Sequence, residues 1–161
     1  VEVSGESMVP TLHDGDELVL NKAILPKRGD IIVLNIDEKN YWIIKRVIGI
    51  EGDTIKFEND KVYRKTIDDE DFILIDEDYT QGITEPKGQT IYFVGEGEYF
   101  FLGDNREKSS DSRYYGVRTE EDLVGVVTSW SLKQKGFWYS FNKVINYPSN
   151  WFSSCKNTIG E

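Results

Sequence analysis

Short apolar runs that begin directly after Gly-Asp pairs are the main regularity along the chain. There are three such pairs, Gly15-Asp16, Gly29-Asp30 and Gly52-Asp53, and each is followed by four residues rich in β-branched or apolar types. A Gly-Asp turn followed by a run of this kind predicts a β-strand. The first half of the chain is therefore expected to be an antiparallel β assembly.

Further strands are expected beyond these turns. The polar residues 58–61 separate the runs 54–57 and 62–64, which predicts a tight hairpin. Apolar runs also predict strands at 91–94, 99–102 and 123–130, whereas helical periodicity is confined to short pieces near 119–122. The pattern predicts a mostly β fold with an antiparallel sheet core and few short helices.

The β-branched run at 41–50 has a polar exception at its centre. Strand alternation would place Lys45 on the same face as Ile43 and Val47. A lysine at its ordinary pKa of about 10.4 is neutral in only about 0.04% of molecules at pH 7, and burial against apolar side chains lowers that pKa. Lys45 is thus a candidate general base; the alternative is a lysine that reaches the sheet edge or pairs with an acid.

The composition changes twice along the second half. Residues 66–87 are rich in acids, Gly and Pro, and predict a solvated loop or lobe at the sheet edge; a partner-docking arm is the alternative. We expect one catalytic domain over residues 1–133, with an inserted acidic lobe at about 66–90. Residues 134–161 form an aromatic-rich tail, for which packing on the domain is favoured over a membrane-skimming segment or a partly ordered terminus.

The overall composition excludes several classes of protein. At 161 residues the chain is long enough for one domain, and its net charge of −10 argues against a nucleic-acid partner. Cys155 is the single cysteine, so neither a disulfide framework nor a cysteine metal cluster is expected, and we predict no metal and no cofactor. No apolar run is long enough to span a membrane, yet the strongest motif lies very near residue 1. We therefore expect an upstream segment that has been removed.

Two polar segments carry further candidate chemistry. Ser7 lies between Gly5, which permits close backbone approach, and Pro10, and its N–H could serve as an oxyanion donor. Residues 103–113 follow an apolar run and are dense in short polar side chains, among which Asp111 and Arg113 could form a local ion pair. Taken singly, each segment is more typical of a turn. Since the chain has one histidine, a serine paired with a lysine is the more plausible catalytic pair.

Together these segments resemble bacterial type I signal peptidases, the membrane-anchored Ser/Lys proteases that remove signal peptides from exported proteins. The resemblance extends from residue 4 to about residue 127, and a glycine two residues before the serine, here Gly5, is familiar in Gram-positive relatives. Four motifs occur in the family's order. They are Ser-Gly-Glu-Ser-Met-Val-Pro-Thr-Leu at 4–12, Arg-Gly-Asp-Ile-Ile-Val at 28–33, Lys-Arg-Val-Ile-Gly at 45–49 and Gly-Asp-Asn-Arg with the following Ser-Ser-Asp-Ser-Arg within 103–113.

The resemblance implies a role for each candidate residue. Ser7 would be the nucleophile and Lys45 the general base, while Ser109 would orient the lysine amine. Supporting positions would be Asp111, Arg113, Met8, Arg46 and Gly5. At the Gly5 position some members of the family carry a hydroxyl that assists the oxyanion, so here the oxyanion hole would rest on the Ser7 N–H.

The resemblance also implies a substrate, a location and a fold. The substrates would be preprotein signal peptides with small residues at positions −3 and −1, selected by shallow apolar pockets. The chain would lie on the extracytoplasmic face of the bacterial cytoplasmic membrane, held to the lipid bilayer by an upstream anchor. The family fold is an antiparallel β catalytic core with a variable inserted lobe, to which the acidic region would correspond.

Three alternatives remain open at this stage. One is a signal-peptidase-like assembly factor or chaperone that holds exported subunits without cutting them. Another is a self-cleaving repressor-like Ser/Lys protease, which would need a DNA-binding partner domain and an internal cleavage site. The third is a Ser–His mechanism that uses His13, although no orienting Asp is evident.

Overall fold

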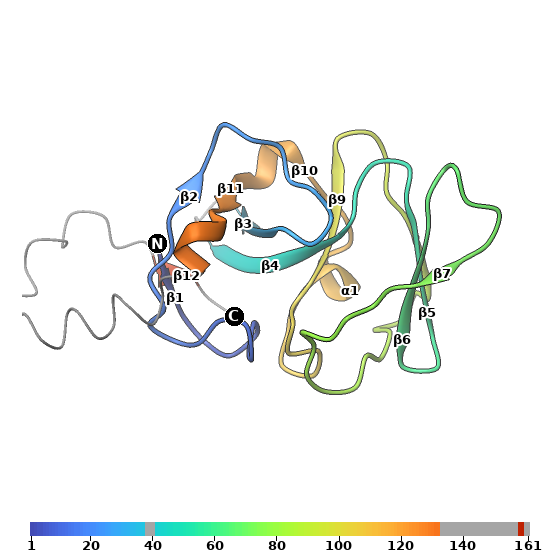
Figure 1. Cartoon of the computed structure of the whole chain (residues 1–161), viewed down its shortest axis with the longest axis horizontal. Helices are drawn as coiled ribbons and strands as arrows, with labels where there is room; N and C mark the ends of the chain where they lie inside the picture. The colour runs from blue at the N-terminus through green and yellow to red at the C-terminus, as the bar shows by residue number, and fades with distance from the viewer. Residues whose placement is uncertain (38–40, 133–157, 160–161) are drawn as a thin grey trace, which may run out of the picture.

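Two antiparallel sheets form most of the structure, a computed structural model that describes residues 1–37, 41–132 and 158–159 (Figure 1). The larger sheet has six strands. From one edge to the other they are β10 (Arg118–Thr119), β9 (Glu98–Leu102), β4 (Trp42–Gly49), β3 (Ile31–Asn35), β11 (Leu123–Val127) and β2 (Leu20–Asn21). The mostly β, antiparallel fold predicted from the apolar pattern is confirmed.

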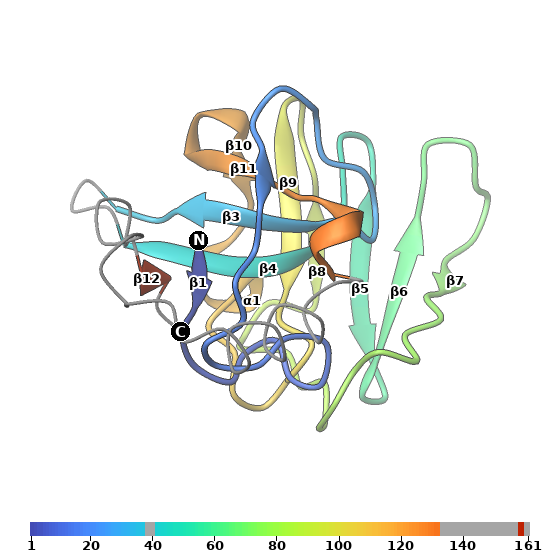
Figure 2. The ribbon, with the colours of Figure 1, turned by 60° about the vertical axis from the view of Figure 1, so that its left-hand side comes forward.

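The smaller sheet lies beside β9, on the right of Figure 1 and again on the right of Figure 2. Its four strands, in spatial order, are β7 (Ile73–Leu74), β6 (Lys61–Lys65), β5 (Thr54–Glu58) and β8 (Ile91–Phe93). The predicted hairpin joins β5 to β6, and its two central residues, Asn59 and Asp60, have φ of +50° and +60°. Positive φ at both positions is the pattern of a type I′ turn, which matches the twist of the paired strands.

A third pairing is short and parallel. Strand β1 (Glu2–Val3) pairs with β12 (Thr158–Ile159), so the two ends of the described chain lie together. The aromatic-rich tail predicted at 134–161 otherwise lies outside the described residues.

The helical content is low, as expected. The 3-10 turn η1 (Glu120–Asp122) occurs where the sequence predicts a helical piece. A second short helix, α1 (Ser112–Tyr115), was not predicted, and it lies inside the polar segment 103–113. Asp111 caps this helix by accepting a hydrogen bond from the Arg113 N–H, which explains why a helix begins in so polar a stretch.

Two predicted strands differ from the observed ones by more than one residue at an end. The run 17–20 makes only a bridge at Glu17 and joins the sheet at β2, because the Leu18 N–H donates to the Val1 carbonyl and its side chain enters the core. The strand predicted at 123–130 ends at Val127. After it residues 129–132 are helical, and this turn begins at Thr128, whose N–H donates to the Val19 carbonyl and whose carbonyl accepts from the Ser131 N–H.

Strand β4 lies at the centre of the core. One set of buried residues packs around Ile44 and a second around Ile43 and Val47, so both faces of the strand are covered. A third cluster joins the two sheets, with Phe57 and Tyr92 of the smaller sheet against Phe100 of β9. A strand buried on both faces holds its side chains in fixed positions, which matters for the polar residues that it carries.

Candidate active site

Ser7 lies in the turn that follows β1, and the turn is held on both sides of it. Gly5 has a φ of +89°, a conformation that side chains disfavour, and its N–H donates to Asp14 Oδ1 at 2.8 Å. Met8 is 1% exposed and packs in the cluster around Ile44. The Ser7 side chain is itself buried, at 3% exposed.

Lys45 lies on β4, between Ile43 and Val47 on one face of the strand. The shared face is the one that the alternation in the sequence predicts, and all three side chains are completely buried. The Lys45 Nζ donates to Ser7 Oγ at 2.8 Å and to the Ile44 carbonyl at 2.8 Å. The fold therefore brings together two residues that are 38 positions apart in the chain.

The loop after β9 contacts the backbone carbonyl of Ser7. The Asn105 N–H donates to the Ser7 carbonyl at 3.0 Å. A Cβ atom at Gly103 would lie 2.6 Å from that same carbonyl and 2.2 Å from Ser109 Oγ. Only a glycine at position 103 permits this close approach of the two loops.

Ser109 lies within this contact, beside Gly103. Its Oγ is buried and has no hydrogen-bond partner among the described residues. The bond to the Lys45 amine that the sequence resemblance implies is absent from the hydrogen bonds between described residues, and the orienting role stays a prediction.

Asp111 and Arg113 form the predicted ion pair, and both are buried. Arg113 Nε donates to Asp111 Oδ1 and Nη2 to Oδ2, each at 2.9 Å. Asp111 Oδ2 also accepts from the Gly103 N–H at 3.0 Å, and Arg113 donates to the Arg106 carbonyl at 2.6 Å. The pair thus fixes both ends of the loop that contacts Ser7.

Arg46 is the neighbour of Lys45 on β4 and forms a bidentate pair with Asp104. Its Nε and Nη2 donate to the two Asp104 oxygens at 2.8 and 2.6 Å, and Thr11 Oγ1 donates to the same carboxylate at 2.5 Å. Burial lowers the pKa of Arg46, but the hydrogen bonds to Asp104 and its charge outweigh burial, so the pKa is raised and the guanidinium stays charged. Thr11 and Asp104 were given no role of their own from the sequence, although both lie in the motifs at 4–12 and 103–113.

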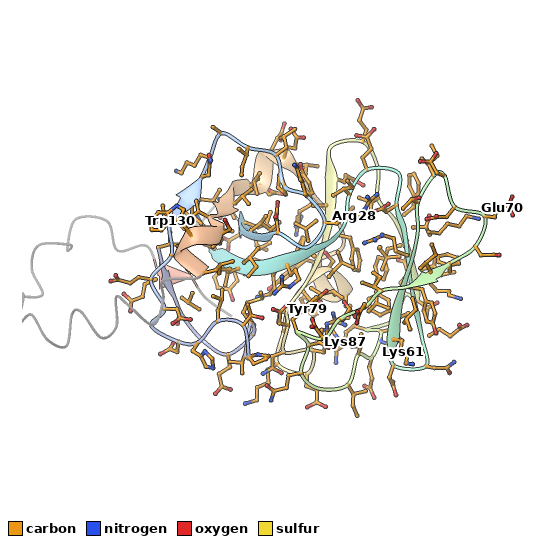
Figure 3. All side chains as sticks on the ribbon, in the orientation of Figure 1. Arg28, Lys61, Glu70, Tyr79, Lys87 and Trp130 are labelled. Carbon is orange, nitrogen blue, oxygen red and sulfur yellow. The ribbon has the colours of Figure 1, made fainter. Side chains whose placement is uncertain are left out.

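Tyr79 covers this pair from the acidic segment. The Arg46 guanidinium carbon lies 4.1 Å from the centroid of the Tyr79 ring. Tyr79 is labelled in Figure 3, where it lies at the boundary of the two sheets. Burial raises the pKa of Tyr79, and the nearby charge of Glu77 raises it further, so its hydroxyl is protonated at neutral pH. The sequence offered no signal for this contact, because an acid-rich stretch predicts a solvated loop.

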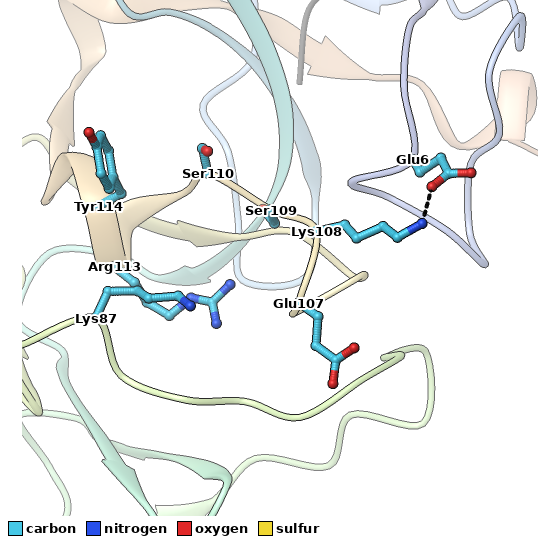
Figure 4. A pocket seen from close by; sticks show the side chains of 8 residues that line it. All are labelled: Glu6, Lys87, Glu107, Lys108, Ser109, Ser110, Arg113 and Tyr114. Carbon is cyan, nitrogen blue, oxygen red and sulfur yellow. Dashed lines mark hydrogen bonds and ion pairs between the residues drawn. The ribbon is translucent and has the colours of Figure 1, made fainter.

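An open hollow on the surface borders Ser109 (Figure 4). Glu6, next to the nucleophile candidate, pairs with Lys108 at 2.5 Å across this hollow, and Arg113 contributes to its lining. Both partners of the ion pair are more than half exposed, so the pair contributes little to stability.

His13 lies on the surface and is not brought to Ser7. Its side chain is exposed, and its backbone N–H donates to Asp16 Oδ2. In the part of the chain that the structure describes, no group of three His, Cys, Asp or Glu side chains is arranged to hold a metal ion. None of the helices formed by residues 1–37, 41–132 and 158–159 has the length and apolar composition of a membrane-spanning helix.

Comparison with known proteins gives consistent matches. The family described as signal peptidase, peptidase S26, matches residues 1–131. Signal peptidase I of Streptococcus pneumoniae serotype 4 is 35% identical over 160 residues, with 78% of each chain covered. Signal peptidase IB of Staphylococcus aureus strain MRSA252 is 35% identical over 158 residues, with 87% of this chain and 81% of the relative covered.

A solved structure matches as well. The crystal structure of a signal peptidase I from Enterococcus faecalis V583 aligns with a TM-score of 0.50 at 31% identity. The alignment covers 65% of this chain and 98% of that one.

Proposed function

The chain belongs to the signal peptidase family S26, and we propose that Ser7 and Lys45 are the nucleophile and general base with which it cleaves. Its function is the removal of signal peptides from exported preproteins as a serine peptidase. The family match and the relatives lend no support to an assembly factor or a self-cleaving repressor.

The observation that carries the dyad is the 2.8 Å separation of Lys45 Nζ and Ser7 Oγ at a fully buried lysine. Burial disfavours the charged ammonium, and a base needs the neutral amine. The same separation suits a hydrogen bond in which the Ser7 hydroxyl donates to the amine. Ser7 Oγ would attack the peptide carbonyl while Lys45 takes its proton, and Lys45 would then protonate the leaving amine.

Deacylation would use the same two residues in reverse. Lys45 removes a proton from water as the water attacks the acyl ester, and it returns that proton to Ser7 Oγ. Within the described residues the Ser7 N–H donates no hydrogen bond, which leaves it available to the oxyanion.

Ser109 is proposed to orient the amine of Lys45. Its Oγ is a buried hydroxyl without a partner in the described part of the chain, and it lies beside Gly103, close to the Ser7 loop. Buried hydroxyls normally have a hydrogen-bond partner, so an unpartnered one at this place favours a function over a purely structural role. Arg46, Asp111, Arg113 and Met8 would support the dyad through the contacts described above.

The substrate and membrane details complete the proposal. The cleaved signal peptides would carry small residues at positions −3 and −1. The family is membrane-associated, and we place this domain at the extracytoplasmic face, held by an upstream anchor. A panel of peptides with Ala replaced by Leu at each position tests the first point, since equal cleavage of all members would contradict it.

The dyad is tested with two variants and a matched lysine control. Purified Ser7→Ala and Lys45→Met should lose at least about 10³-fold in kcat on a signal-peptide substrate while they keep the wild-type circular dichroism spectrum. Lys56→Met, on the smaller sheet, should cleave at the wild-type rate. Undiminished cleavage by Lys45→Met would remove lysine from the mechanism, and wild-type binding of the substrate without turnover would favour the assembly factor.

A further inference from the structure

The acidic segment returns from the smaller sheet and lies along the loop that contacts Ser7. Gln81 forms a parallel bridge with Asn105. The Gln81 N–H donates to the Asp104 carbonyl and the Arg106 N–H donates to the Gln81 carbonyl, each at 2.8 Å. We call residues 77–84 the strap, because they add one extended segment to the loop at 104–106.

Two side chains of the strap bind Arg106, whose own side chain is completely buried. Glu77 accepts hydrogen bonds from both terminal nitrogens of Arg106, with Nη1 to Oε2 at 3.0 Å, and Thr84 Oγ1 accepts from Nη1 at 2.8 Å. Arg106 Nε donates to the Gly103 carbonyl at 3.2 Å. The Arg106 side chain therefore connects the Glu77 carboxylate to the backbone of Gly103, at the start of the loop that contacts Ser7.

The strap contacts the surroundings of both dyad residues, Ser7 through the loop at 104–106 and the neighbour of Lys45 directly. Asn105, between the two strap hydrogen bonds, donates its N–H to the Ser7 carbonyl at 3.0 Å. On the other side, Tyr79 lies over Arg46, which follows Lys45 on β4. Tyr79 Oη also donates to Glu77 Oε1 at 3.2 Å, so the two contacts share one carboxylate.

We propose that the strap holds Ser7 in line with Lys45, and that Glu77 is a positioning residue for the cleavage reaction. Glu77 touches neither reacting group and acts through Arg106 and the Asn105 N–H. The inference rests on the proposed function, since it assigns the strap a part in the same site.

The first test replaces Glu77 with glutamine, which keeps the shape of the side chain and removes its charge. Displacement of a reacting group by about 1 Å can cost about 100-fold in rate, so we expect Glu77→Gln to lower kcat by about tenfold to 100-fold. KM for a signal-peptide substrate should stay within about twofold, because the variant disturbs the alignment of Ser7 with Lys45 and leaves substrate binding intact. Hydrogen exchange at the Asn105 amide should accelerate by about tenfold, because the hydrogen bond to Ser7 then opens more often.

Asp78→Asn is the matched control. Asp78 is exposed, carries the same charge and is the next residue on the strap. Its variant should keep the wild-type kcat and Asn105 exchange rate. The proposal is overturned if Asp78→Asn loses as much as Glu77→Gln, or if folded Glu77→Gln loses only thermal stability while kcat and the exchange rate stay unchanged.

A second pair of variants keeps the proposal testable if Glu77→Gln does not fold. Tyr79→Leu removes the ring over Arg46 and should lower kcat several-fold, whereas Tyr79→Phe keeps the ring and should restore most of it. Equal kcat in the Leu variant and the wild type would contradict the proposal.

Failure of the strap is distinguishable from failure of the proposed function. A wild-type protein that cuts no signal-peptide substrate would refute the function. The Asn105 exchange rate in Glu77→Gln would still show whether the strap fixes the loop behind Ser7.

Discussion

The two sheets differ in how they treat charged and apolar side chains. In the six-stranded sheet, β4 is buried on both faces, and its two basic residues, Lys45 and Arg46, are held by short contacts to Ser7 and Asp104. In the four-stranded sheet one face is buried, while Ile91 and Phe93 of β8 are 47% and 66% exposed. A strand buried on both faces has the rigidity that a catalytic pair needs. The exposed face of the smaller sheet should tolerate substitutions of its side chains better.

The largest difference is expected between ion pairs of the two sheets. Asp104→Asn leaves the nearly buried guanidinium of Arg46 without its carboxylate, which should cost about 3–5 kcal/mol of unfolding free energy. Glu58→Gln removes the exposed partner of Lys56 and should cost less than about 1 kcal/mol. Urea unfolding measures both, and equal losses would mean that burial does not separate the two sheets.

The contact of the strap with the six-stranded sheet, Tyr79 over Arg46, gives a smaller, pH-dependent effect. Because the folded pKa of Tyr79 is raised, its contribution to stability is complete below about pH 10 and is lost as the pH rises further. One pH unit above that point the loss is at most about 1.4 kcal/mol, and partial solvent exposure reduces it. Tyr79→Phe should therefore show a shallower fall in stability between about pH 9 and pH 11, and an unchanged slope would exclude this phenol as a source.

A matched pair of core and surface substitutions gives a comparable or smaller effect. Ile44→Val removes one methylene from a side chain that is 1% exposed and should cost about 0.5–1.5 kcal/mol. Ile91→Val makes the same change at a position 47% exposed and should cost less than about 0.5 kcal/mol. Thermal denaturation of the two variants compares the sheets directly, and a larger loss at Ile91 would reverse the comparison.

The smallest effect concerns the turn of the smaller sheet. Asp60 has a φ of +60°, which glycine adopts more readily, so Asp60→Gly should stabilise the hairpin by about 0.5 kcal/mol. Urea unfolding detects the gain, and cleavage activity should not change. A loss of activity would show that the hairpin turn communicates with Ser7.

The sequence predicted the parts of this molecule that depend on local pattern. Alternation predicted that Lys45 shares a strand face with Ile43 and Val47, and the polar residues 58–61 predicted the hairpin. The spacing of Asp111 and Arg113 likewise predicted their ion pair.

The contacts that the sequence did not predict join distant segments. Glu77 and Tyr79 belong to an acid-rich stretch whose composition predicts solvation, and only the folded chain places them against Arg106 and Arg46. The same holds for Thr11, whose hydroxyl binds a carboxylate 93 residues away. Composition reports the average surroundings of a segment, whereas a single buried partner decides the position of an individual side chain.

The alternation of β4 has a further consequence. Ile32 is opposite Lys45 and Ile31 is opposite Arg46 in the pairing of β3 with β4, so consecutive residues project to opposite faces of the sheet. A slip of one residue in that pairing would exchange the faces, directing Arg46 or Ile44 toward Ser7 and removing the lysine from it. The register of β3 against β4 is therefore a determinant of the chemistry of this enzyme. The backbone hydrogen bonds between the two strands select which side chain of β4 meets Ser7.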